Sequence, residues 1–310
     1  MAGKIYNIEK LTFPQIDALD RDKTAFLIAV SPLEEHGPHL PVGVDAFHAG
    51  LFTRQAAEII IRERPEFDAA LFPLIPLGTQ VYKYIGSFYI KPSTLYDIVY
   101  NTGRGIAIYN FKYIFVFSAH GTPKQIVAVE AACRKVSKKH SMSMLSLTGA
   151  LAVKFLSGKM YSEIAEQLGR SFTDEEQYLL KYDFHAGWWE TAMMLKYFPE
   201  LVDKSYKDLK PYLKNLATRK IITPEIKSQG YLGSPAKAEP DFAEASMKVF
   251  ARIATQLINR CLNGEDITRK TTSPYYKYPN FHPFFKRNLI FGIIVIIFIA
   301  MITLIIKLYL

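Results

Sequence analysis

Short apolar runs alternate with longer helical patterns through the first half of this 310-residue chain. The strand-like runs are 24–30, 69–75, 113–117 and 142–147, and the helical patterns between them are 47–62, 93–110 and 123–139. Further helical patterns follow at 151–156, 188–197 and 242–262. Strands separated by helices of this length are typical of βαβ units. We therefore predict an α/β fold whose mainly parallel sheet is covered on both faces.

The C-terminal part of the chain has a different character. Residues 289–306 are eighteen consecutive residues without a charge, and such a helix is roughly 27 Å long, close to the hydrocarbon thickness of a bilayer. Lys286 and Arg287 precede this stretch and Lys307 follows it. The pattern predicts one transmembrane helix, a single-pass tail anchor with the large domain on the cytoplasmic side of the lipid bilayer. The alternative is a helix buried in the core.

The rest of the composition limits the classes of partner and compartment. The net charge is +9, but the basic residues form no dense block, so we expect no nucleic acid partner. The two cysteines, Cys133 and Cys261, indicate no disulfide framework, which fits a reducing compartment. We divide the chain into a domain over 1–264, a juxtamembrane linker rich in proline and aromatic residues over 265–288, and the transmembrane helix over 289–306.

A dense set of polar side chains follows the first predicted strand. The segment carries Glu34, Glu35, His36, His39 and Asp45. Ligands of parallel α/β sheets bind beyond the carboxyl ends of the strands, and imidazole with carboxylate is a common ligand set for divalent metals. Glu34 and His36 lie two residues apart and point the same way on an extended segment. An aspartate can bridge two ions about 3.5–4 Å apart, so this segment predicts a metal site.

Three further segments carry similar chemistry. His120 follows the strand-like run 113–117, and His185 lies just before the helical pattern that contains Glu190. A glycine-containing segment occupies 230–235. Each histidine alone is more often structural, and a carboxylate in a first helical turn is also favoured by the helix dipole. The set as a whole predicts loops that converge on one site.

These segments resemble motifs of the creatininase family. Residues 34–41 followed by Asp45 resemble its E-Q-H-G-P-H-L-P…D signature, and His120-Gly121 resembles its H-G-G-N segment. His185-Ala186-Gly187 with Glu190-Thr191 resembles H-A-G-x-x-E-T, and 230–235 resembles the late G-x-x-G-D-P segment. The order and spacing agree over about residues 5–260.

The resemblance implies a three-layer α/β/α amidohydrolase with two divalent metal ions, zinc or manganese, and a homo-oligomeric assembly. It implies that the metal ligands are Glu34, His36, Asp45, His120 and Glu190. It also implies that His185 is a catalytic histidine near the substrate.

Other residues near the motifs have two interpretations. Glu35 and His39 are candidates to support the metal ligands, or they are a solvated pair in a loop. Trp188 is a candidate to line an aromatic substrate pocket, or it is a core residue.

The chain also departs from the family motifs on the substrate side. The segment that resembles H-G-G-N reads His120-Gly121-Thr122-Pro123, and Ser234 stands where the late motif has an aspartate. A proline there removes a backbone donor. These changes indicate either a substrate other than creatinine or a fold that has lost catalysis.

The function that we predict is a membrane-tethered, metal-dependent amidohydrolase. It would cleave a small-molecule amide at a C–N bond other than an ordinary peptide bond, such as a cyclic amide or a formamide. The nucleophile would be a hydroxide that bridges the metals. The alternatives are a catalytically silent metal-binding scaffold at the membrane and a metallopeptidase of a small modified peptide.

Overall fold

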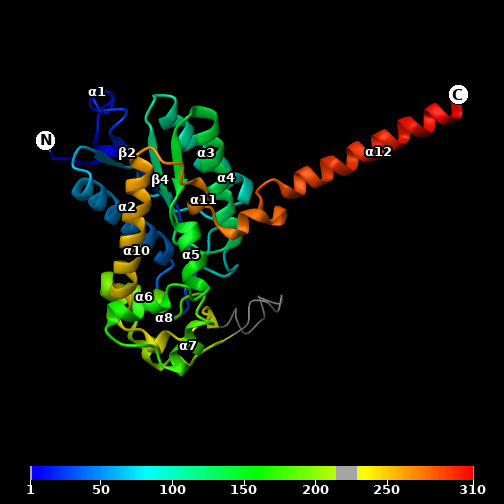
Figure 1. Cartoon of the computed structure of the whole chain (residues 1–310). Coiled ribbons are helices and arrows are strands. Elements are labelled where there is room, and N and C mark those ends of the chain that lie inside the picture. Colours follow the sequence, from blue (N-terminus) through cyan, green and yellow to red (C-terminus); the bar gives the residue numbers. More distant parts are fainter. Residues whose placement is uncertain (1, 214–228, 310) are drawn as a thin grey trace.

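A parallel β-sheet forms the centre of the protein (Figure 1). A computed structural model describes residues 2–213 and 229–309. Within these residues the sheet has five strands, all paired in parallel, in the order β1-β3-β2-β4-β5. Their bounds are Ile5–Asn7 (β1), Thr24–Ala29 (β2), Asp68–Leu71 (β3), Tyr113–Phe117 (β4) and Ser143–Ser146 (β5). The predicted parallel sheet is confirmed.

Helices cover both faces of this sheet because the strand side chains are apolar on both sides. On β2, Phe26 and Ile28 pack with α3 (Pro92–Ala107) and α4 (Pro123–His140). Ala25 and Leu27 alternate with them and pack with α2 (Val44–Glu63) and α10 (Pro240–Leu262). Successive side chains of a strand point to opposite faces. The predicted three-layer α/β/α arrangement follows from this burial on both faces.

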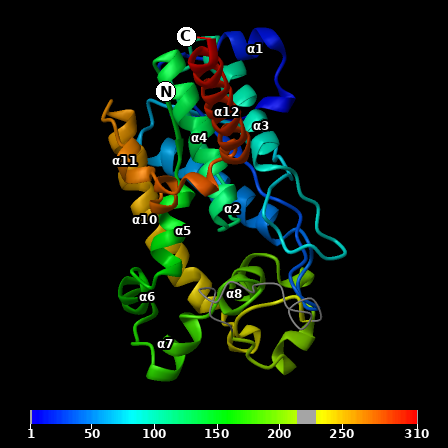
Figure 2. The same cartoon turned by 90° about the vertical axis from the view of Figure 1, so that its right-hand side faces the viewer.

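A helical layer lies beyond the carboxyl ends of the strands (Figures 1 and 2). It consists of α5 (Thr148–Leu156), α6 (Tyr161–Leu168), α7 (Asp174–Leu180) and α8 (Trp188–Tyr197). With part of α10 these helices enclose a separate aromatic-rich core. The remaining short helices are η1 (Ile8–Lys10), α1 (Phe13–Asp17), η2 (Pro199–Leu201), η3 (Lys204–Asp208), η4 (Pro235–Lys237), α11 (Thr268–Thr271), η5 (Pro274–Lys277) and η6 (Pro279–Phe281).

The C-terminal apolar segment forms the long helix α12 (Phe285–Tyr309), which projects away from the domain (Figure 1). Its stretch Phe285–Thr303 is long and apolar enough to cross a membrane, and none of its apolar window is buried against the protein. The predicted span 289–306 falls inside this helix. The alternative of a buried core helix does not match this exposure.

The segment before α12, residues 265–284, packs on the surface of the domain. Ser273 donates hydrogen bonds from its backbone N–H and its hydroxyl to the carboxylate of Glu130 on α4, at 2.8 and 3.0 Å. The guanidinium of Arg134 lies 4.7 Å from the ring centre of Tyr276. We call residues 265–284 the juxtamembrane segment, and its contacts fix where α12 leaves the domain.

The contact between Glu130 and Ser273 predicts that docking of the juxtamembrane segment depends on pH. Burial raises the pKa of Glu130 from 4.5 to about 7, although its bonds from Ser273 and the charge of Arg134 oppose the rise. A carboxyl group whose pKa is raised by burial stabilises the folded state fully below its ordinary pKa, and this gain is lost as pH rises to about 7. That rise corresponds to roughly 3 kcal/mol at most. The juxtamembrane segment covers part of this carboxyl, so part of the gain depends on its docking.

We therefore expect the juxtamembrane segment to exchange its amide hydrogens faster at pH 8 than at pH 5, after correction for intrinsic rates. Glu130→Gln keeps an oxygen that can accept from Ser273 but cannot ionise, so its protection should not vary with pH. Equal pH dependence in the parent protein and in this variant would contradict the assignment.

Candidate metal centre

The predicted ligands come together at the carboxyl edge of the sheet. Glu34 and His36 lie in the loop after β2, and His120 follows β4. Asp45 and Glu190 lie in the first turns of α2 and α8, where the helix dipole favours a carboxylate. All five are largely shielded from solvent by the surrounding loops and helices.

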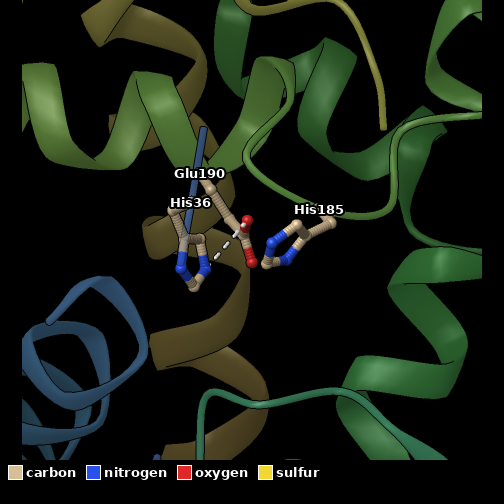
Figure 3. Close-up of side chains that lie close together, drawn as sticks. All are labelled: His36, His185 and Glu190. Atoms are coloured by element: carbon tan, nitrogen blue, oxygen red, sulfur yellow. Dashed lines mark ion pairs between the residues drawn. The ribbon is translucent and has the colours of Figure 1, made fainter. Parts of the chain in front are cut away.

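Among the described residues, two groups of side chains have the spacing of metal ligands. In the first, the Nδ1 atom of His120 lies 3.1 Å from a Glu34 carboxylate oxygen and 3.0 Å from an Asp45 oxygen. The second group contains His36, His185 and Glu190 (Figure 3). Within each group the potential ligand atoms all lie within 4.8 Å of one another. The five predicted ligands therefore divide between two adjacent groups.

The second group is built around the Glu190 carboxylate. Figure 3 shows this carboxylate between the two imidazole rings. His36 Nε2 lies 3.6 Å from a Glu190 oxygen, and the ring centres of His36 and His185 are 4.3 Å apart. His185, which we predicted as a catalytic residue, thus lies within reach of a metal held by His36 and Glu190.

Backbone carbonyls orient all three imidazoles in the same manner. One ring nitrogen of each lies near a carbonyl oxygen: His36 Nδ1 at 2.9 Å from Glu34, His120 Nε2 at 3.3 Å from Gln80, and His185 Nε2 at 2.7 Å from Glu35. Those nitrogens carry the proton when the rings are neutral, because a carbonyl oxygen only accepts. The other nitrogen of each ring is then free to bind a metal, as in known metal sites.

A bound cation would stabilise the buried carboxylates of this centre. Burial by itself lowers the pKa of His120, but the carboxylates of Glu34 and Asp45 outweigh it and raise that pKa well above its ordinary value. Burial raises the pKa of Glu190 to about 7, with His36 opposing and Asp45 adding to the rise. Buried carboxylates are costly unless they are paired or bind metals.

Incompletely partnered atoms indicate that the residues fit such an ion. Glu34 Oε2 and Asp45 Oδ2 are buried and share one neighbour, His120 Nδ1, at 3.1 and 3.0 Å, and the buried His36 Nε2 has no hydrogen-bond partner. Most buried polar atoms in proteins do have one. Carboxylate oxygens and imidazole nitrogens gathered in such groups are a suitable donor set for zinc or manganese.

An unforeseen carboxylate holds the start of α8. Asp183 is buried and accepts hydrogen bonds from the backbone N–H groups of Trp188 and Trp189, at 2.6 and 2.9 Å. Gly187 and Gly233 make room for it, because a Cβ atom on either would lie about 2 Å from its Oδ1 (1.9 and 2.1 Å). The only sequence signal was an acidic residue shortly before a helical pattern. Asp183 thereby positions the segment that carries His185 and Glu190.

Glu35 and His39, the residues predicted to support the metal ligands, are both buried beside the metal centre. Glu35 accepts a hydrogen bond from the N–H of Gly37, and its other carboxylate oxygen lies 3.8 Å from His185 Nε2. His39 Nε2 lies 2.8 Å from the hydroxyl of Thr191, and burial with nearby His36 lowers the pKa of His39 to about 4. Both residues are buried, so neither belongs to a solvated loop pair.

The two tryptophans differ in environment. The Trp188 side chain is 1% exposed and packs against Phe242, with ring centres 5.4 Å apart. The neighbouring Trp189 lines the cavity beside the metal centre and donates a hydrogen bond to Ser246. The structure therefore places Trp188 in the aromatic core, and Trp189 next to the space open to a substrate.

A cavity of about 1150 Å³ borders both groups of ligands. His120, His185 and Glu190 line it, together with Tyr82, whose ring centre lies 4.4 Å from that of His185. The backbone N–H of Tyr82 donates a hydrogen bond to Glu34. Tyr82 is another residue that sequence reasoning missed, because its loop carries no recognisable motif.

The altered segment after His120 has a structural explanation. Thr122 is the N-cap residue of α4, and Pro123 is its first residue. Proline suits this position because the first N–H groups of a helix have no partner within it. The substitution thus builds the start of α4, and it leaves His120 in the first ligand group.

The fold and the two ligand groups define the class of this protein. It is an α/β/α protein with a histidine- and carboxylate-lined candidate metal centre at the carboxyl edge of a parallel sheet. A family model for creatininase, described as creatinine amidohydrolase, matches residues 9–259. The chain therefore belongs to the creatininase family.

Solved structures agree on the fold. A creatinine amidohydrolase (creatininase) structure has a TM-score of 0.63 and 18% identity, covering 82% of this chain and 97% of its own. A manganese creatininase has a TM-score of 0.62 and 19% identity, covering 82% and 98%. A mutant creatininase described as Zn–Zn type has a TM-score of 0.62 and 18% identity, covering 82% and 97%. A comparison with curated proteins gave no significant match.

Proposed function

We propose that this protein is a membrane-tethered amidohydrolase with two divalent metal ions. The observation that carries the proposal is the pair of ligand groups, with every imidazole oriented by a backbone carbonyl and its free nitrogen turned toward carboxylates. Its family membership and its creatininase fold support the same reaction class. The substrate that we propose is an amide other than an ordinary peptide.

The five predicted metal ligands would be shared between the two ions. Glu34, Asp45 and His120 would hold one ion, and His36 with Glu190 would hold the other, with Asp45 between them. When bound, the ions would supply a bridging hydroxide near neutral pH and polarise the amide carbonyl.

His185 has its Nε2 on the carbonyl of Glu35, so its Nδ1 is free toward the cavity. There it can accept a proton from the attacking water and pass it to the leaving nitrogen. Burial and the charge of Glu34 raise the pKa of the Tyr82 hydroxyl, so this group stays protonated and remains a hydrogen-bond donor.

The test combines metal analysis with a substrate screen. Full-length protein should contain close to two equivalents of zinc or manganese by mass spectrometry. Loaded protein should hydrolyse members of a set of cyclic amides and formamides faster than matched dipeptides. Folded protein that takes up no metal would overturn the proposal, and metal uptake without hydrolysis of any amide would favour the silent metal-binding scaffold. Hydrolysis confined to the dipeptides would favour the metallopeptidase instead.

We also propose that α12 anchors the domain at the cytoplasmic face of a bilayer and that the domains assemble as a homo-oligomer. Deleting residues 285–310 leaves the juxtamembrane segment in place, and it should move the protein from the membrane fraction to the supernatant. The physical reason is the loss of an apolar helix long enough to span the hydrocarbon layer. Fractionation in high salt measures this result, and protein that stays with membranes would contradict the anchor. Light scattering of the truncated protein measures the subunit number.

A further inference from the structure

The cavity beside the metal centre is much larger than a small amide needs. Its volume is about 1150 Å³, whereas pockets for drug-sized ligands are roughly 300–1,000 Å³. From its volume and lining we infer that the substrate is an amphipathic amide, with its amide group at the metal centre and a long alkyl chain in the rest of the cavity. This inference rests on the proposed hydrolase function and names the substrate class.

Much of the cavity wall is apolar. It is formed by side chains from α2, α5 and α10, including Phe52, Leu151, Phe155, Met247, Phe250 and Ala254. Among the described lining residues, the acidic and basic ones are His120 and four residues of the segment 181–190, which carries His185 and Glu190. A cavity that combines candidate metal ligands with such an apolar wall matches a molecule with a polar head and an apolar chain.

The cavity wall also includes the segment that leads to the membrane. Tyr275 and Phe281 of the juxtamembrane segment line the cavity. This segment is held on α4 by the hydrogen bonds from Ser273 to Glu130, and it continues directly into α12. A substrate with a long alkyl chain partitions into the bilayer in which α12 would lie, so the tether and the cavity favour the same class of molecule.

The reaction is an ordinary hydrolysis and needs no further reactant. Water adds to the amide carbonyl carbon, and the bond from that carbon to nitrogen breaks. One product is a carboxylate, and the nitrogen leaves as an amine or ammonia after it takes up a proton. No electrons are transferred, and the alkyl chain keeps all its bonds.

Chain binding can be measured without catalysis because the sequence has two tryptophans, Trp188 and Trp189. Trp189 lines the cavity and Trp188 lies in the core. In nanodiscs that hold the full chain, 12-bromododecan-1-ol should quench tryptophan fluorescence by contact with Trp189, and 3-bromopropan-1-ol should not. Trp189→Phe should remove most of this quenching. The bromoalcohols contain no amide, so the result does not depend on hydrolysis.

Hydrolysis is then followed in a series that differs only in chain length. The series runs from acetamide to dodecanamide and from N-methylformamide to N-dodecylformamide, which places the chain on either side of the amide. Each buried methylene is worth about fourfold in binding, so kcat/KM should rise at least roughly a hundredfold along one of the two series.

Matched variants connect the effect to the cavity. Ala254→Phe places a ring in the apolar part of the cavity, so it should remove most of the preference for the long chain. Ala165→Phe on α6, a part-buried alanine that does not line the cavity, is the control for general effects of a larger side chain. If Ala254→Phe fails to fold, the quenching of the parent protein still decides the question.

The outcomes separate the two proposals. Quenching by the long alcohol together with a rise in kcat/KM along the series supports both. Quenching without hydrolysis of any amide supports the chain site and contradicts the hydrolase. Hydrolysis that is independent of chain length, without quenching, keeps the hydrolase and overturns the amphipathic substrate.

Discussion

Asp45→Asn should abolish amide hydrolysis, with a loss on the order of a thousandfold or more, and should sharply lower the metal content. Asp45 is 1% exposed, and its Oδ2 lies 3.0 Å from His120 Nδ1 in the first ligand group. Asparagine has almost the same volume but no charge, so the centre would lose one of the anions that offset the charge of the proposed metal ions. The loss should therefore exceed that of any variant outside the two ligand groups.

A matched control is Asp241→Asn. Asp241 also lies in the first turn of a long helix, α10, but its side chain is exposed. The same change of charge at the same helical position should leave metal content and hydrolysis within about twofold, because the helix dipole contributes only ~0.3–1 kcal/mol at an exposed site. Full metal content in folded Asp45→Asn protein would show that Asp45 is not a ligand.

The parallel sheet could be predicted because local signals suffice for it. The strand-like runs at 24–30 and 113–117 are apolar on both faces, which is typical of a covered parallel strand. The structure has strands there, at Thr24–Ala29 and Tyr113–Phe117. β1 and α1 were missed because each is too short for a periodic pattern.

The ligand cluster was predictable for a similar reason. Parallel strands end at the same edge, so polar residues that follow different strands meet in space even when they are far apart in sequence. Glu34 and His120 follow β2 and β4, which are neighbours in the sheet. The sequence could not show which ligands group together, because that depends on how the start of α8 approaches the sheet.

Contacts that depend on tertiary structure were beyond the sequence. The prolines and aromatic residues of 265–288 indicated a linker, but the hydrogen bonds from Ser273 to Glu130 join residues 143 positions apart. Trp188 and Trp189 are adjacent, and only the rotation of α8 decides which of them faces the cavity. These features follow from packing between elements rather than from local patterns.

Asp183→Ala should lower the stability of the domain and the metal content together. The carboxylate accepts buried hydrogen bonds from the N–H groups of Trp188 and Trp189, and an unsatisfied buried N–H costs about 1–3 kcal/mol. A loss of roughly 2–5 kcal/mol follows, or about 2–4 °C in the unfolding midpoint for each kcal/mol. Metal content should fall as well, because the same turn holds His185 and Glu190 in place.

The control is Thr173→Ala, which removes a helix cap away from the metal centre. The Thr173 hydroxyl accepts a hydrogen bond from the N–H of Glu176 at the start of α7. Its loss should cost about 1 kcal/mol and leave the metal content unchanged. Thermal unfolding and metal analysis of both variants test the assignment. If Asp183→Ala is destabilised but binds metal as well as the parent protein, then Asp183 stabilises the fold without positioning the ligands of α8.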